Sequence, residues 1–225
     1  MSMVNQAKHV WFMRHGNPAF DYENCTYDEF IEMLSNGTYT PLAGDHGIDL
    51  ASLPLNVELI CHSPARRAFE TAKKLKENLN VKSVEPMDAL SEVSFDKEII
   101  GRSEYKSIKD SRPRILQRWF KNENKAESFQ ESIARVRRIE EFLQNRQEEK
   151  IIFVTHGLFL RLLELYFVQG KREKDITLSD LLAVKPIKLG QFVEATLKFG
   201  SSTESNFHVA QALSTKQKHF GGETL

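Results

Sequence analysis

A histidine lies between an arginine and a glycine directly after an apolar run near the amino terminus. These residues are Arg14, His15 and Gly16, and the histidine-glycine pair returns at His156 and Gly157 after a second apolar run. A neutral imidazole can act as a nucleophile, and a neighbouring guanidinium favours anionic substrates such as phosphoryl groups. The two pairs therefore predict a site for chemistry on an anionic group.

A third candidate piece of this site begins at Ser63 and Pro64, which are typical of a helix start. Arg66 and Arg67 follow in the first turn of the expected helix. A helix amino terminus attracts anions, and arginine offers a planar fork that matches phosphate oxygens. From the residues alone, Arg14 and one of Arg66 or Arg67 could clamp a tetrahedral phosphate.

The elements that must position these residues alternate along the chain. Short apolar runs at 9–13, 57–61 and 151–155 are typical of buried parallel strands. Helical spacing of apolar residues predicts helices at 63–78 and 127–147, with the many charges of the second on a solvated face. Strands alternating with helices predict an α/β fold, a three-layer α/β/α sandwich round a doubly wound, mostly parallel sheet. Both histidines would then lie at the carboxyl edge of this sheet, where ligands bind.

The remaining segments complete a single predicted domain over residues 1–225. Apolar and charged residues alternate over 193–199, the period of a half-exposed edge strand. Residues 18–49 are rich in Tyr, Asn, Gly and Asp and resemble an insertion, with one short helix expected around 27–34. We expect the polar residues 200–225 to form a tail without regular structure.

Composition argues against several function classes. The 225 residues contain 31 Lys and Arg against 31 Asp and Glu, so no net charge points to nucleic acid or to a membrane surface. Residues 1–8 lack the apolar core of a signal peptide, and no apolar run is long enough to span a membrane. The two cysteines have no spacing typical of zinc or of a disulfide framework. We therefore expect a cytoplasmic protein that binds neither nucleic acid nor membrane.

The order of the motifs resembles the histidine phosphatase superfamily, also called phosphoglycerate mutase-like, in its cytoplasmic branch. The resemblance covers most of residues 9–199. It rests on the 14–16 triplet, on residues 63–72 in the family form S-P-x-x-R-A-x-x-T-A, on 90–92 and on 156–157. Each motif alone is weak, but together in this order they are specific.

The resemblance implies roles for individual residues. His15 would be the nucleophile, and Glu92 would give a proton to the leaving oxygen. Arg67 is preferred over Arg66 because it holds the R-A position of the family motif. The phosphate-binding residues that the resemblance implies are Arg14, Asn17, Arg67 and His156. Arg14, Arg67 and His156 are also expected to act in catalysis, together with His15 and Glu92.

Three departures from the family pattern affect these assignments. Residues 42–47 lack the Thr, the Gly spacing and the Gln that the family has in its substrate loop. The acidic segment lacks the usual Trp and Gly, so that Asp96 and Glu98 compete with Glu92 for the acid role. The insertion at 18–49 is a candidate lid over the pocket.

The predicted activity is hydrolysis of phosphomonoesters through a phosphohistidine on His15, with no metal and no cofactor. Positive charge from arginines would neutralise the transition state, so that no metal ion is required. The substrate would be a phosphorylated small molecule or a phosphoprotein. Two alternatives remain: a phosphotransferase of the phosphoglycerate mutase type, and a regulatory module that binds phosphate without turnover.

Overall fold

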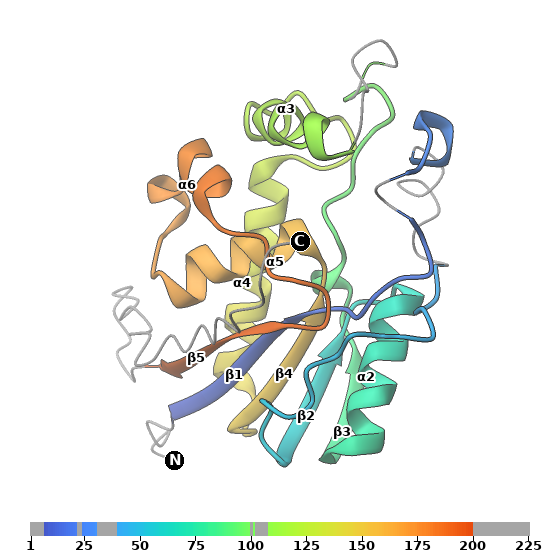
Figure 1. The fold of residues 1–225 in the computed structure, drawn as a ribbon. Coiled ribbons are helices and arrows are strands. Elements are labelled where there is room, and N and C mark those ends of the chain that lie inside the picture. The colour runs from blue at the N-terminus through green and yellow to red at the C-terminus, as the bar shows by residue number, and fades with distance from the viewer. Residues whose placement is uncertain (1–6, 22–23, 31–39, 100, 102–107, 200–225) are drawn as a thin grey trace.

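One sheet organises the part of the chain that the computed structural model describes, residues 7–21, 24–30, 40–99, 101 and 108–199 (Figure 1). Its strands follow the order β3-β2-β4-β1-β5. They are β1 (Ala7–Arg14), β2 (Asn56–His62), β3 (Asn80–Pro86), β4 (Lys150–Thr155) and β5 (Phe192–Lys198). Strands β1 to β4 pair in parallel, whereas β5 runs antiparallel to β1 at the edge. The mostly parallel sheet with an edge strand near the carboxyl end is confirmed.

Helices cover both faces of the sheet (Figure 1). They are α2 (Arg66–Asn78), α3 (Ile108–Phe120), α4 (Phe129–Asn145), α5 (Gly157–Leu163) and α6 (Leu178–Ala183), with short 3₁₀ turns η2 (Asp88–Leu90) and η5 (Glu173–Asp175) and a π-helical turn η4 (Glu164–Val168).

Strand β1 shows how the two faces are separated. Trp11 and Met13 pack into a core that includes Ala68 and other residues of α2. Val10 and Phe12 point to the opposite core, which includes residues of α4 and α5. This alternation follows from the period of two in a strand, and it produces the predicted three layers.

The predicted helices differ from the observed ones at several places. The expected helix at 63–78 begins only at Arg66, and Ser63 is not its cap, because the residue before the helix is Ala65. The helix expected at 127–147 is α4, opened by a capping box of Ser128 and Glu131. Its charges do not all face solvent as predicted, because the side chains of Arg135 and Glu140 are buried.

The sequence patterns do not indicate strand β3 or helices α3, α5 and α6. Strand β3 carries few apolar residues and only partial burial, because it is the sheet's other edge and needs no continuous apolar run. Helix α3 contains Pro113, a residue that argues against a helix interior.

Part of the insertion lies against α2. The backbone N–H of Leu42 donates to Glu70 Oε2 at 2.7 Å, and Leu42 also forms a bridge with Pro18. Residues 27–30 are helical, as expected at the start of the 27–34 segment. The rest of that predicted helix and the predicted tail at 200–225 lie outside the described residues.

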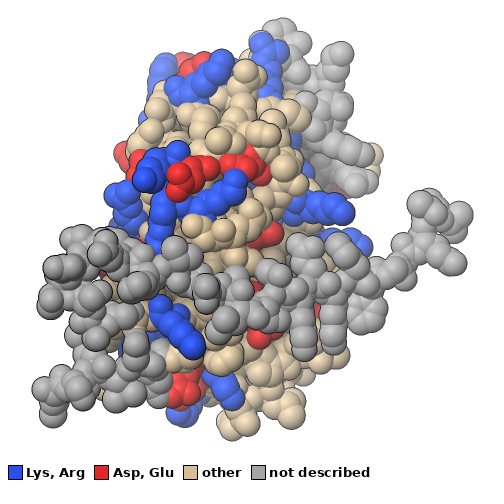
Figure 2. Space-filling view, turned by 90° about the vertical axis from the view of Figure 1, so that its left-hand side faces the viewer, with Lys and Arg blue, Asp and Glu red and all other residues tan. Residues whose placement is uncertain are grey.

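Charges of both signs are interleaved on the face that α4 and α6 help to form (Figure 2). Several of them are paired, including Arg137 with Glu173 and Lys171 with Asp180. Within the described part of the chain, none of the helices has the length and apolar character needed to cross a bilayer.

Candidate active site

The carboxyl ends of three adjacent parallel strands bring the candidate residues together. Arg14 at the end of β1 is in register with Thr155 at the end of β4. The residues that follow, His15 and His156, have their rings edge to face with centroids 5.0 Å apart. Both histidines are almost completely buried, with 3% and 1% of their surfaces exposed. The structure therefore places the two predicted histidines in one cluster.

Arg67 connects the two histidines. Its Nε–H donates to Nε2 of His15 at 3.1 Å, and its terminal Nη2 lies 3.0 Å from Nδ1 of His156. The guanidinium belongs to the first turn of α2 and is 7% exposed. Arg66 instead points outward and pairs with Glu70. Of the two arginines left open by the residue pattern, Arg67 is the one in the cluster.

Hydrogen bonding determines which nitrogen of each histidine carries the proton. Nδ1 of His15 lies 2.8 Å from the carbonyl of Gly16, which can only accept, so this nitrogen is the donor. Nε2 of His15 therefore carries a lone pair. His156 has the opposite arrangement, because its Nδ1 accepts from Arg67 and its Nε2–H donates to the hydroxyl of Ser63 at 2.8 Å.

Both imidazoles are held neutral. Burial lowers the pKa of His15 well below its ordinary value, and the positive charges of Arg67 and Arg14 lower it further. Burial also lowers the pKa of His156, with the neighbouring Arg67 as the next cause. A neutral imidazole keeps the lone pair that a nucleophile needs.

The turn that carries His15 is fixed by α2. The Gly16 N–H donates to the hydroxyl of Thr71 at 3.0 Å, and this hydroxyl donates to the carbonyl of Arg67 at 2.7 Å. A side chain at Gly16 would overlap the carbonyl of His46, so the turn requires glycine. The positions of His15 and Arg67 are therefore coupled through Thr71.

Arg14 lies beside the first turn of α5. Its Nη1 donates to the carbonyl of Ile187 at 3.0 Å. A Cβ added at Gly157 would stand 3.2 Å from Cζ of Arg14, so glycine leaves room for the guanidinium at the start of the helix. Arg14 is close enough to lower the pKa values of both histidines by its charge.

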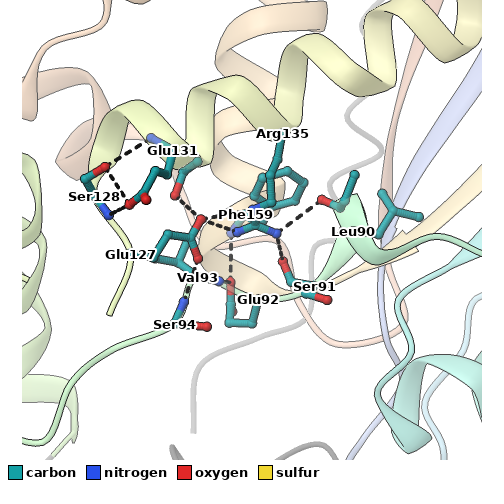
Figure 3. Close-up of polar contacts among 12 residues, drawn as sticks. Leu90, Ser91, Glu92, Val93, Ser94, Glu127, Ser128, Glu131, Arg135 and Phe159 are labelled. Atoms are coloured by element: carbon teal, nitrogen blue, oxygen red, sulfur yellow. Dashed lines mark hydrogen bonds and ion pairs between the residues drawn. The ribbon is translucent and has the colours of Figure 1, made fainter. Parts of the chain in front are cut away.

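Glu92 is bound to the same first turn of α5 (Figure 3). The backbone N–H groups of Leu158 and Phe159 donate to its carboxylate at 3.1 and 2.9 Å, and that of Val93 donates at 3.0 Å. The preceding segment is tied to β4, because the Thr155 hydroxyl donates to the carbonyl of Leu90 at 2.6 Å. The structure thus brings Glu92 to the turn that directly follows His156.

The competing carboxylates have other partners. Asp96 accepts the backbone N–H of Lys125 at 2.5 Å and that of Glu98 at 2.9 Å. Glu98 is 73% exposed and pairs with the Lys125 ammonium. These contacts stabilise the loop before α4, whereas Glu92 is bound to the turn that directly follows His156.

The side-chain hydrogen bonds of Asn17 and His62 are made to backbone carbonyls and not to the two histidine rings. The Asn17 amide donates to the carbonyl of Asp45 at 3.0 Å in the loop after the insertion. Nδ1 of His62 donates to the carbonyl of Ser63 at 2.8 Å, and its ring lies against Phe69. Within the described part of the chain, no group of three or more His, Cys, Asp or Glu side chains could hold a metal ion.

Three residues that the sequence patterns do not indicate as part of the site support it: Ser63, Thr71 and Arg135. The sequence predicts Ser63 as a helix cap, whereas its hydroxyl accepts from His156. Thr71 lies in the family motif, but its partner is distant in the chain. Arg135 was grouped with solvated charges although it is buried.

The family model described as histidine phosphatase superfamily (branch 1) matches residues 10–180. No curated protein shows a significant sequence match to the chain.

Solved structures share the fold at low sequence identity. Mycobacterial hydrolase 2 is 12% identical, with a TM-score of 0.57 over 94% of each chain. Phosphoserine phosphatase from Entamoeba histolytica is 16% identical, with a TM-score of 0.55 over 83% of this chain and 89% of that one. The α-ribazole phosphatase from Shigella flexneri is 18% identical, with a TM-score of 0.52 over 96% of this chain and 100% of that one. With the family match over most of its length, this chain belongs to the histidine phosphatase superfamily, branch 1.

Proposed function

We propose that this protein hydrolyses phosphomonoesters through a phosphohistidine formed on Nε2 of His15, without a metal ion. One observation carries the proposal. His15 is buried and neutral, its Nδ1 proton is held by the Gly16 carbonyl, and its Nε2 lone pair faces the guanidinium of Arg67. This is the geometry of a nucleophile beside a group that binds its anionic target.

In the first step, phosphate oxygens of the substrate accept the N–H groups of Arg67 that otherwise point to the histidines. This exchange frees the lone pair on Nε2 of His15, which attacks phosphorus. The N–P bond forms as the P–O bond to the leaving group breaks. Glu92 gives a proton to the departing oxygen, while Arg14 and Arg67 neutralise charge on the equatorial oxygens.

In the second step, water enters on the side from which the alcohol has left. The Glu92 carboxylate takes a proton from the water as its oxygen attacks phosphorus. The N–P bond breaks, inorganic phosphate leaves, and His15 returns to the neutral form. One water is consumed and one alcohol and one phosphate are released in each cycle.

Family membership supports phosphoryl chemistry on this scaffold, and two of the related structures bear the name phosphatase. The names of these two proteins refer to different substrates. We therefore propose only the substrate class, phosphomonoesters, which includes phosphorylated small molecules and phosphoproteins. The expected compartment is the cytoplasm.

Trapping the intermediate tests the proposal. Enzyme quenched after mixing with ³²P-labelled substrate should retain label in alkali and lose it in acid, because the phosphoramidate bond is acid-labile and base-stable. His15→Ala should not become labelled. His62→Asn is the matched control, because His62 is also a buried histidine at a strand end but belongs to no step. Turnover by His15→Ala at the wild-type rate would overturn the proposal.

Analysis of the reaction products distinguishes hydrolysis from mutase activity. With 3-phosphoglycerate as substrate, a phosphatase releases inorganic phosphate, whereas a mutase returns the phosphoryl group to give 2-phosphoglycerate. A regulatory module would bind phosphate and form neither product. We expect inorganic phosphate to be the main product of any phosphomonoester that the protein accepts.

A further inference from the structure

A buried ion pair lies next to the segment that carries Glu92 (Figure 3). Arg135, in α4, donates from Nε and Nη2 to the same oxygen of Glu127, at 2.9 and 2.6 Å. The two side chains are only 10% and 12% exposed. Because desolvation offsets most of the attraction, a buried ion pair contributes little net stability compared with apolar residues of similar size. Its geometry therefore calls for an explanation other than stability.

The pair binds the chain on both sides of Glu92. Arg135 Nη1 donates to the carbonyl of Ala89 at 3.2 Å and to that of Ser91 at 2.6 Å. On the other side, Glu127 Oε2 accepts the backbone N–H of Ser94 at 2.9 Å. The backbone next to Glu92 is thus held by both members of the ion pair.

Arg135 also contacts the element that binds the Glu92 carboxylate. Its guanidinium lies over the ring of Phe159, 4.2 Å from the centroid. The backbone N–H of Phe159 is one of the groups that donate to Glu92. One guanidinium therefore contacts the segment that carries Glu92 and the helix turn that orients its carboxylate.

We propose that Arg135 and Glu127 are positioning residues that hold Glu92 where it can deliver its proton to the leaving oxygen. This inference rests on the function proposed above. The pair does not touch the substrate, and it acts only through Glu92. Displacement of a reacting group by about 1 Å can reduce a rate by roughly a hundredfold.

The chain offers a matched control in a second ion pair, between Arg172 and the α4 residue Glu140. Arg172 donates to Glu140 at 3.1 Å, and its guanidinium lies over the ring of Tyr166 at 4.7 Å. It therefore has the same composition as the first pair, an arginine, a carboxylate and an aromatic ring. This pair joins α4 to η4 and to the segment after it, not to the Glu92 segment.

Single-turnover phosphorylation rates test the proposal with two substrates, p-nitrophenyl phosphate and β-glycerophosphate. Nitrophenolate leaves almost unaided, whereas an alkoxide requires a proton donor. Arg135→Lys keeps the charge but loses the planar fork. Its rate should fall at least about tenfold more with β-glycerophosphate than with p-nitrophenyl phosphate. Arg172→Lys should change both rates by the same factor.

Three further variants distinguish an error in the positioning role of Arg135 and Glu127 from an error in the acid role of Glu92. Glu92→Gln should show the same substrate dependence, and Arg135→Lys in that background should add none. If Glu92→Gln discriminates between the substrates and Arg135→Lys does not, the positioning role is wrong while the acid role stands. If Glu92→Gln slows the reaction equally with both substrates, Glu92 is not the proton donor, and the positioning role of Arg135 and Glu127 is wrong as well. Glu127→Gln provides a second, independent disruption of the pair and should behave as Arg135→Lys does.

Discussion

The low pKa values of His15 and His156 should make the stability of the protein depend on pH. An exposed histidine in the unfolded chain has a pKa near 6.5, whereas the folded pKa of His15 and of His156 lies well below this value. As the pH falls below 6.5, the unfolded state binds protons that the folded state does not. Stability is therefore fully present above pH 6.5 and is lost as the pH falls toward the folded pKa values.

The size of the decrease in unfolding free energy follows from the difference in proton binding between the unfolded and the folded state. Between pH 7.5 and pH 5.5, each histidine that stays neutral in the folded state costs about 1.4 kcal/mol of unfolding free energy. The two together cost roughly 3 kcal/mol, provided that they titrate independently. Carboxylates with ordinary pKa values remain ionised over most of this range, so they contribute little.

Urea unfolding at pH 7.5 and pH 5.5 measures this difference in the wild type and in two variants. His15→Gln places an amide oxygen near the position of Nε2, and His156→Asn places one near Nδ1, so that Arg67 keeps an acceptor in each. Each variant should lose about 1.4 kcal/mol less than the wild type between the two pH values. Above pH 7.5, the unfolding free energies of the wild type and of the variants should change with pH by the same amount, which serves as the internal control. If His15→Gln and the wild type lost the same free energy, burial and Arg67 would not be keeping His15 neutral.

Three other results are expected. Ser63→Ala should lower the unfolding free energy by about 1–3 kcal/mol in urea titrations, because it leaves the buried N–H of His156 without its acceptor; an unchanged midpoint would contradict this. Gly190→Ala should cost more than about 1 kcal/mol by the same measurement, because Gly190 has a φ of +73° and its added Cβ would overlap the backbone of Gly47. Phosphatase activity should survive EDTA, since Arg14 and Arg67 supply the positive charge; loss with EDTA and recovery with a divalent ion would refute the metal-free mechanism.

The position of the histidine cluster could be predicted because it depends on strand ends. Apolar runs before His15 and His156 identify buried strands, and parallel neighbours present their carboxyl ends at one edge. The distinction between Arg66 and Arg67 could not be made from residue type, since it depends on which side of α2 faces the sheet. The family motif supplied this information and agreed with the structure.

The supporting residues could not be predicted, because their partners are distant in the chain. Arg135 lies on a helix rich in charge, and nothing in the local spacing distinguishes it from Arg137, which is exposed. Only the packing of α4 against Phe159 shows that one arginine is buried and the other is not. Similarly, the Ser63-Pro64 pair has the local signature of a helix start, and the bond from His156 to Ser63 exists only after β2 and β4 have paired.

The contact between Arg67 and His15 has a consequence for substrate choice. In the absence of ligand, an Arg67 N–H points at the lone pair that the nucleophile must use. This hydrogen bond is replaced at little cost only by a ligand that offers the guanidinium better acceptors, and phosphate oxygens are better acceptors than a neutral imidazole because they are charged. A neutral electrophile offers no such exchange and meets a nucleophile whose lone pair is engaged. In the proposed mechanism, Arg67 would therefore both bind the phosphoryl group and restrict the reactivity of His15 to anionic substrates, without any movement of the backbone that Thr71 and Gly16 hold in place.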